Sequence, residues 1–206
     1  MKPLKPAFTL IEILIVVAII VVLLGMTTQM IGAASDSQNR SKAITDMAAL
    51  ATALESFNAT YGVYPKLATP SNEKENSAKL YKCLTGRMYM AIDNNGRITF
   101  KEGKREAFVK ASIDISNAKG DEDVDPDAPD AFFVDPWGNP YVYIYDTSTS
   151  AGKLGSWESP TFILLSKGAD GKSVISSNMI EEGYIGDVAS YRKKEGNDDD
   201  IINGID

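Results

Sequence analysis

The chain has 206 residues, of which 44% are hydrophobic, so it is long enough to bury a core. Its 28 acidic residues outnumber its 21 basic ones and give a net charge of -7, which argues against a phosphate-tracking basic surface and therefore against nucleic-acid binding. The sequence has no histidine and one cysteine, Cys83, which excludes histidine-dependent catalysis, imidazole-ligated zinc and an intrachain disulfide.

The segment from Phe8 to Met26 is almost entirely apolar, and only Thr9, Glu12 and Gly25 interrupt it. As a helix rising 1.5 Å per residue it would be about 28 Å long, which matches the hydrocarbon core of a bilayer. The preceding residues, 1–7, contain two lysines and no acid. The positive-inside rule therefore predicts a cytoplasmic N-terminus and an extracytoplasmic remainder.

Glu12 makes this segment unusual. A secretory signal peptide cleaved near the small residues 32–34, or a plain membrane anchor, would explain the basic start and the apolar run. Neither explains a carboxylate inside the run, because burying an ionisable group in lipid is costly and usually marks a functional residue. A further alternative is that Glu12 only complements the positive end of the helix dipole.

The N-terminal sequence KPAFTLIEILIVVAII resembles that of type IV prepilins and type II secretion pseudopilins. The resemblance implies that a prepilin peptidase removes residues 1–7 by cutting between Ala7 and Phe8, and that Phe8 is then N-methylated. The family usually has glycine before the cut, where this chain has Ala7. It also implies that Glu12 pairs with the N-terminal amine of a neighbouring subunit, an attraction that would offset the cost of burying the carboxylate.

A second helical pattern follows the polar stretch 27–42. Apolar residues recur there in steps of three and four: Ile44, Met47, Leu50, Ala51, Leu54, Phe57 and Tyr61. This spacing predicts an amphipathic continuation of the helix over residues 27–61, ended by Gly62 and Pro65. A helix over residues 8–61 would be about 80 Å long, which favours a polymer subunit over an enzyme.

The remaining residues, 62–206, are expected to form an extracytoplasmic globular domain. The alternation from Met88 to Ile92, the turn at Asn95 and Gly96, and the residues that follow predict a β-hairpin. Residues 71–79 are predicted to form a solvated loop or a short helix, and residues 141–145 and 161–166 to form strands. The fold class is therefore α+β: a long N-terminal helix packed on a small antiparallel sheet, with a C-terminal loop region.

The stretch DPWGNPYVY, residues 135–143, resembles a signature of the major pseudopilins of type II secretion. SKGADG, residues 166–171, and NDDDIING, residues 197–204, resemble the C-terminal loop of the same subfamily, which binds calcium. The resemblance implies Asp170 and Asp199 as side-chain ligands, Asp200 as a neighbour, and the backbone carbonyls of Lys167 and Lys172 as further ligands.

The segments 166–171 and 197–204 can also be interpreted as ordinary turns without a metal, for two reasons. Short turns rich in Asp and Gly also occur without a metal, and residues 172–196 separate the two segments by more than in the subfamily.

Residues 66–129 lie outside the resemblance and are interpreted as an enlarged insertion. The alternating aspartates at 121–127 are a minor candidate for a cation site, but charge runs are more often solvated loops.

Together the residues and the resemblance predict a non-enzymatic, pilin-like subunit of a type II secretion pseudopilus. Its expected parts are the leader 1–7, the transmembrane and assembly helix 8–26, the amphipathic helix 27–61 and the periplasmic domain 62–206. The resemblance implies a homopolymer through N-terminal helices, minor pseudopilins, an inner-membrane assembly platform and a prepilin peptidase as partners. It also implies an inner-membrane precursor and a filament after assembly. A surface type IV pilin for adhesion, motility or DNA uptake, or a membrane-anchored extracytoplasmic binding module, remain alternatives.

Overall fold

The computed structural model describes residues 9–65, 67, 73–95, 98–120, 124–145, 162–173, 191, 193 and 198–203, with the side chains of residues 24–34 outside the description. The chain divides into two compact units, Met1–Gln38 and Asn39–Asp206. The predicted divisions at residues 7, 26 and 61 stay predictions.

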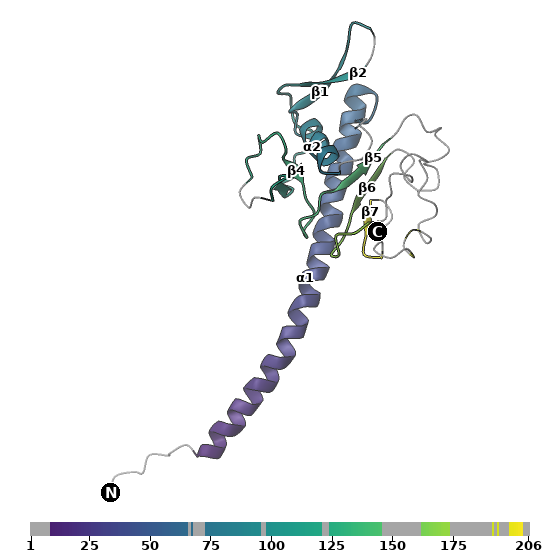
Figure 1. Cartoon of the computed structure of the whole chain (residues 1–206). Helices are drawn as coiled ribbons and strands as arrows, with labels where there is room; N and C mark the ends of the chain where they lie inside the picture. The colour runs from purple at the N-terminus through teal and green to yellow at the C-terminus, as the bar shows by residue number, and fades with distance from the viewer. Residues whose placement is uncertain are drawn as a thin grey trace. The chain divides into compact units, whose positions relative to one another are not determined.

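Helix α1 spans Leu10–Tyr61 and contributes residues to both units (Figure 1). It ends at Gly62, which has a φ of +75° and whose N–H donates to the carbonyl oxygen of Asn58 at 2.7 Å. Glycine takes this left-handed conformation without a Cβ clash, so the backbone closes the last helical turn and then leaves the helix. The predicted end of the helix is confirmed.

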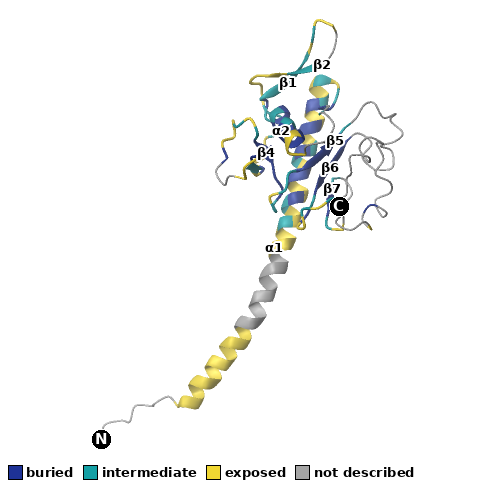
Figure 2. Cartoon of the chain, in the orientation of Figure 1, coloured by how far each residue is buried: buried dark blue, intermediate teal, exposed yellow. Residues whose placement is uncertain are grey.

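In the first unit, α1 exposes apolar side chains all round. The large apolar residues from Leu10 to Leu23 are 48–84% exposed (Figure 2). Among the residues that the structure describes, no helix has the length and hydrophobicity needed to cross a membrane.

In the second unit, one face of α1 forms the centre of the core. Four of the predicted positions are buried: Met47, Leu50, Leu54 and Phe57. Ala51 and Tyr61 are partly buried against the same core, and Ala43 and Ala53 are buried in addition. Ile44 was expected on this face but is 36% exposed, whereas Ala53 is fully buried. A helix turns by 100° per residue, so Ile44 lies at the edge of the stripe that Met47, Leu50 and Leu54 define.

Helix α2, Glu73–Leu84, confirms a short helix for residues 73–79, whereas residues 71 and 72 lie outside the described residues. One face of α2 is buried, with Leu80, Tyr81, Cys83 and Leu84 in the same core, whereas its first residues, 73–75, are exposed. Burial raises the pKa of the Cys83 thiol to about 12, so Cys83 acts as a small apolar core residue.

Among the described residues, the strands form three small antiparallel sheets rather than the single sheet expected. β1, Met88–Ile92, pairs with β2, Ile98–Glu102, which confirms the hairpin. β3, Ile115–Ser116, pairs with β4, Phe132–Phe133. β5, Val142–Ile144, β6, Ile163–Ser166, and β7, Ile201–Ile202, form the third sheet in that order.

Strand β7 corrects the prediction of a loop around residues 197–204. Ile202 pairs with Leu165 and Ile201 with Ser166, and both isoleucines are buried. Two apolar residues are too few to show the alternation that identifies a strand from sequence, so this strand depends on its pairing with β6.

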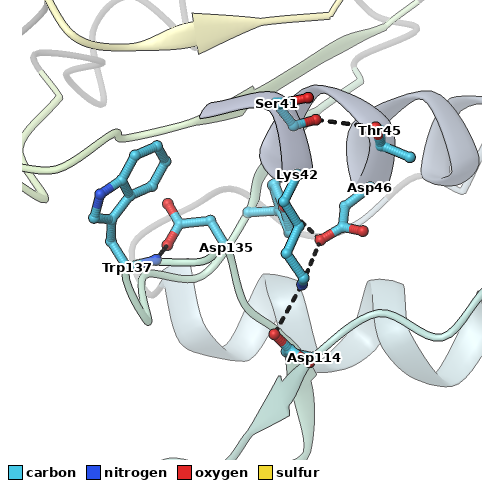
Figure 3. A network of polar contacts seen from close by, with 8 residues as sticks. Ser41, Lys42, Thr45, Asp46, Asp114, Asp135 and Trp137 are labelled. Carbon is cyan, nitrogen blue, oxygen red and sulfur yellow. Dashed lines mark hydrogen bonds and ion pairs between the residues drawn. The ribbon is translucent and has the colours of Figure 1, made fainter. Parts of the chain in front are cut away.

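A polar network joins α1 to the loop before β3 (Figure 3), and its Asp46 also contacts Tyr141, the residue that precedes β5. Lys42 Nζ lies 3.1 Å from Asp46 Oδ2 and 2.8 Å from Asp114 Oδ2. The buried Asp46 also accepts a 3.5 Å hydrogen bond from the Tyr141 hydroxyl. Lys42 therefore compensates a carboxylate that would otherwise be buried without a counter-charge.

The core stripe of α1 predicts a large effect of truncation at Leu54, which is fully buried. We expect Leu54→Ala to lower the free energy of unfolding by about 2–5 kcal/mol, because it removes apolar contacts and leaves a cavity. Urea unfolding of the full chain in detergent, followed by circular dichroism, measures the change. Ser56→Ala, at an exposed position on the same helix, is the control and should change it by less than about 0.5 kcal/mol.

Candidate functional site

The start of α1 carries the first candidate residue, Glu12. The Thr9 N–H and the Thr9 hydroxyl both donate to Glu12 Oε2 at 2.9 Å, and the Glu12 N–H lies 3.3 Å from Thr9 Oγ1. This is a reciprocal capping box, which satisfies backbone donors at the helix start. The spacing Thr-x-x-Glu, from Thr9 to Glu12, is the sequence signal that predicts this cap. Ala7 and Phe8 lie outside the described residues.

The turn after β4 is organised by the buried carboxylate of Asp135. Asp135 Oδ1 accepts hydrogen bonds from the N–H groups of Trp137 at 3.1 Å and Asn139 at 2.8 Å, and Oδ2 accepts one from the Ser166 hydroxyl at 2.6 Å. Burial raises the pKa of Asp135, while these hydrogen bonds act in the opposite direction. The carboxylate ties the turn to the end of β6 (Figure 3 shows its contact with Trp137).

The same turn holds the loop that follows β6. Asn139 Nδ2 donates to the Gly168 carbonyl at 3.0 Å, and the Gly168 N–H donates to Ser166 Oγ at 3.2 Å. Gly168 has a φ of +64°, and a Cβ there would lie only 2.5 Å from the carbonyl oxygen of Asp199. A glycine is therefore required for the loop to pass this close to the C-terminal segment.

The two acidic segments singled out in the sequence are in contact. The Asp170 N–H donates to Asp199 Oδ2 at 2.9 Å, across a separation of 29 residues. Asp170 Oδ1 itself accepts a hydrogen bond from the Lys172 N–H at 2.7 Å, which folds that side chain back onto its own loop. The side chain of Lys167 forms an ion pair with Glu73 at the start of α2.

Asp200 is fully buried beside this contact. Its Oδ2 accepts a hydrogen bond from the Tyr191 hydroxyl, which lies 2.8 Å from Ser173 Oγ. Burial raises the pKa of Asp200 to about 6, and the charges of Asp199 and Asp170 act in the same direction. An ionised Asp200 therefore destabilises this region unless a positive charge compensates it.

Two carboxylate oxygens in this region are buried and have no hydrogen-bond partner among the residues that the structure describes: Asp199 Oδ1 and Asp200 Oδ1. Such atoms are rare in folded proteins, because an unsatisfied buried acceptor loses its hydration without compensation. Carboxylate oxygens are also the ligands that calcium prefers. The Oδ1 atoms of Asp199 and Asp200 could therefore serve as ligands of a cation. Within the described ranges, however, no group of three or more acidic or cysteine side chains has the arrangement of a metal site.

The acidic run at 121–127 engages its described carboxylates in other contacts. Asp125 Oδ1 accepts a hydrogen bond from the Asp127 N–H at 2.9 Å, and Asp127 forms an ion pair with Arg87. Asp121 and Asp123 lie outside the described residues. Ordinary turn chemistry accounts for the part that is described.

Comparison with known proteins gives one match. The family model of the prokaryotic N-terminal methylation motif matches residues 5–28, which include Ala7, Phe8 and Glu12. Searches of curated proteins and of solved structures found no match. The matched motif supports a type IV pilin-like precursor that a prepilin peptidase cleaves.

Proposed function

We propose that this chain is the structural subunit of a type II secretion pseudopilus. The match of the methylation motif to residues 5–28 carries the proposal. A prepilin peptidase cuts between Ala7 and Phe8, Phe8 is N-methylated, and the mature chain polymerises through its N-terminal helix to drive protein export. The pilin-like fold and a non-enzymatic role are parts of the same proposal.

The exposed apolar surface of α1 supports polymerisation. The side chains from Leu10 to Leu23 are unfavourable in water on every face of the helix, because each large apolar side chain gains about 1.5–3 kcal/mol when it becomes fully buried. A helix that is apolar all round needs other helices or lipid around it. We propose that the lipid of the inner membrane surrounds this helix before assembly, with the N-terminus cytoplasmic. After assembly, the helices of neighbouring subunits surround it.

Glu12 is proposed to select the correct register between neighbouring helices. In the single chain the carboxylate contacts of Glu12 with Thr9 both use Oε2. The Phe8 amine of a neighbouring subunit would be attracted to the same carboxylate once apolar helices surround it, since opposite charges interact more strongly away from water. The capping box holds the Glu12 side chain at the helix start, where this partner would arrive.

The assignment to a pseudopilus, rather than a surface pilus, has support from the DPWGNPYVY stretch. Its Asn139 contacts Gly168, which in turn packs against Asp199, so the three segments that resemble the major pseudopilins lie together. The platform, the minor pseudopilins and the peptidase are proposed partners on the same basis.

A structural calcium ion is part of this proposal. Asp199 and Asp200 would hold it through Oδ1 of each side chain, which has no hydrogen-bond partner among the described residues. Asp170, whose N–H contacts Asp199, and the carbonyls of Lys167 and Lys172 are the further ligands that the resemblance implies. The ion would supply the positive charge that the buried carboxylates lack. Sites in extracellular modules bind calcium at about 0.1–1 mM, so such a site would fill only outside the cytoplasm.

Processing gives the first test. We expect the chain, co-expressed with a prepilin peptidase, to lose residues 1–7 and to carry a methylated Phe8, as measured by intact-protein and N-terminal peptide mass spectrometry. Ala7→Gly should be cleaved at least as fast, because the family usually has glycine there, and Ala7→Glu should stay uncleaved. A mature chain that begins at Met1 or near residue 35 would instead indicate a plain anchor or a signal peptide.

Assembly gives the second test. In a strain that lacks the chain, the wild-type protein should restore export of secreted proteins, whereas Glu12→Gln should be processed but fail to assemble, because it cannot attract the Phe8 amine. Secretion assays and cross-linking of neighbouring subunits measure the effect. Glu106→Gln, which removes an exposed carboxylate from the second unit, is the matched control and should behave as wild type. Restoration of surface fibres without any change in secretion would support a surface pilin.

Calcium gives the third test. With a dissociation constant of about 0.1 mM, about 1 mM calcium should stabilise the full chain in detergent by about 1.4 kcal/mol, or about 3–6 °C in a thermal melt, relative to excess chelator. Asp199→Asn and Asp200→Asn should abolish the shift. The neighbouring Asp198→Asn, at an exposed position, should retain it. Identical melts with calcium and with chelator would exclude the calcium site and leave the processing prediction unaffected.

A further inference from the structure

The second unit has an open cavity of about 470 Å³ that the proposed function does not use. It lies between the end of α2, the residues that follow β2 and the turn at 127–129. Its charged lining consists of four basic and two acidic residues: Lys82, Arg87, Lys104, Arg105, Glu102 and Asp127. The cavity is therefore locally positive in a chain whose net charge is -7.

Backbone contacts hold the basic residues in place. The Arg105 N–H donates to the Gly86 carbonyl at 2.7 Å, and the Gly103 N–H donates to the Arg87 carbonyl at 3.0 Å. Gly86 has a φ of +75°, and a Cβ there would lie 2.3 Å from the Arg105 carbonyl oxygen. The two segments that carry Arg87 and Arg105 are thus packed directly against each other.

Two of the cations already hold carboxylates of this chain. Arg87 Nε and Nη2 lie 2.8 and 2.7 Å from Asp127 Oδ1, and Lys82 Nζ lies 3.0 Å from Glu102 Oε1. The side chains of Asp127 and Glu102 are 78% and 75% exposed. The cations Lys82 and Arg87 are 18% and 29% exposed, so a carboxylate from outside can reach them and compete with the exposed acidic partner.

The other two cations have no such partner. In the part of the chain that the structure describes, neither Lys104 nor Arg105 forms an ion pair. The Arg105 guanidinium lies over the ring of Tyr89, 4.6 Å from its centroid. This cation–π contact orients the guanidinium, whose N–H donors match the geometry of a planar oxyanion.

We propose that this cavity binds a small polycarboxylate. One carboxylate of the ligand contacts Arg105 and Lys104, and a second takes the place of Asp127 at Arg87 or of Glu102 at Lys82. Charge-assisted hydrogen bonds to guanidinium are among the stronger polar contacts available on a protein surface. The volume suits an organic ligand of several carbon atoms rather than a single small ion.

Isothermal titration of the full chain in detergent, at low ionic strength, tests the proposal with tricarballylate as the probe. We expect saturable binding that weakens as salt is added. The double variant Lys104→Gln, Arg105→Gln should weaken binding by about tenfold or more, because it removes two charged donors. The double variant Lys110→Gln, Lys119→Gln removes the same charge at exposed positions outside the cavity and should change binding by less than about twofold.

Three results would overturn the proposal: no binding of tricarballylate at millimolar concentration, equal weakening by both double variants, or equally tight binding of phosphate and sulfate. The last result would indicate a general anion site. Thermal melts identify any variant that fails to fold. If the double variant Lys104→Gln, Arg105→Gln fails to fold, Arg105→Lys replaces it. This single variant keeps the charge but loses the planar pair of donors, so it should also weaken binding.

Discussion

The second unit depends on the burial of one face of α1. Met47, Leu50, Leu54 and Phe57 are at most 1% exposed, and α2, β4, β5, β6 and β7 all contribute side chains to the cluster around them. Because burial of apolar surface is the main favourable term in folding, this stripe determines where the other elements pack. It also brings Lys42 and Asp46, on the same helix, to the loop before β3 and to Tyr141, so that the polar network stabilises the same packing.

Short hydrogen-bonded connections then place the acidic loops. Asp135 joins the turn after β4 to Ser166, Asn139 joins the same turn to Gly168, and Gly168 leaves room for Asp199. The result is a concentration of carboxylates in which two oxygens have no hydrogen-bond partner within the described part of the chain. A protein rarely keeps such groups without a reason, since the same site with apolar residues would avoid the desolvation cost. This cost is the physical argument for a cation.

The two charged regions of the second unit differ in burial, and the difference separates their proposed roles. Asp200 is buried, so the ionised side chain requires compensation and the pKa rises to about 6. Around the basic cavity, Asp127 and Glu102 are largely exposed, so their pairs with Arg87 and Lys82 can exchange at little cost. A buried uncompensated charge favours a permanently bound ion, whereas exposed exchangeable pairs favour reversible binding.

The sequence alone was sufficient wherever the information is local. The α1 stripe follows from a 3.6-residue period, the end of α1 from Gly62, and the hairpin of β1 and β2 from alternation around a turn, because neighbouring residues decide each of these features. The processing motif is likewise one continuous segment, and the family model matched it at residues 5–28.

Only the tertiary structure decided the features that join distant residues. β7 exists because Ile201 and Ile202 pair with β6, α2 is buried because the core accepts Leu80 and Leu84, and Asp170 meets Asp199 across 29 residues. The basic cavity combines residues from 82 to 129, a segment for which the sequence predicted a hairpin within an insertion but no basic cavity. Periodicity records which side of an element is buried, but not which distant element covers it, and that choice depends on packing of the whole unit.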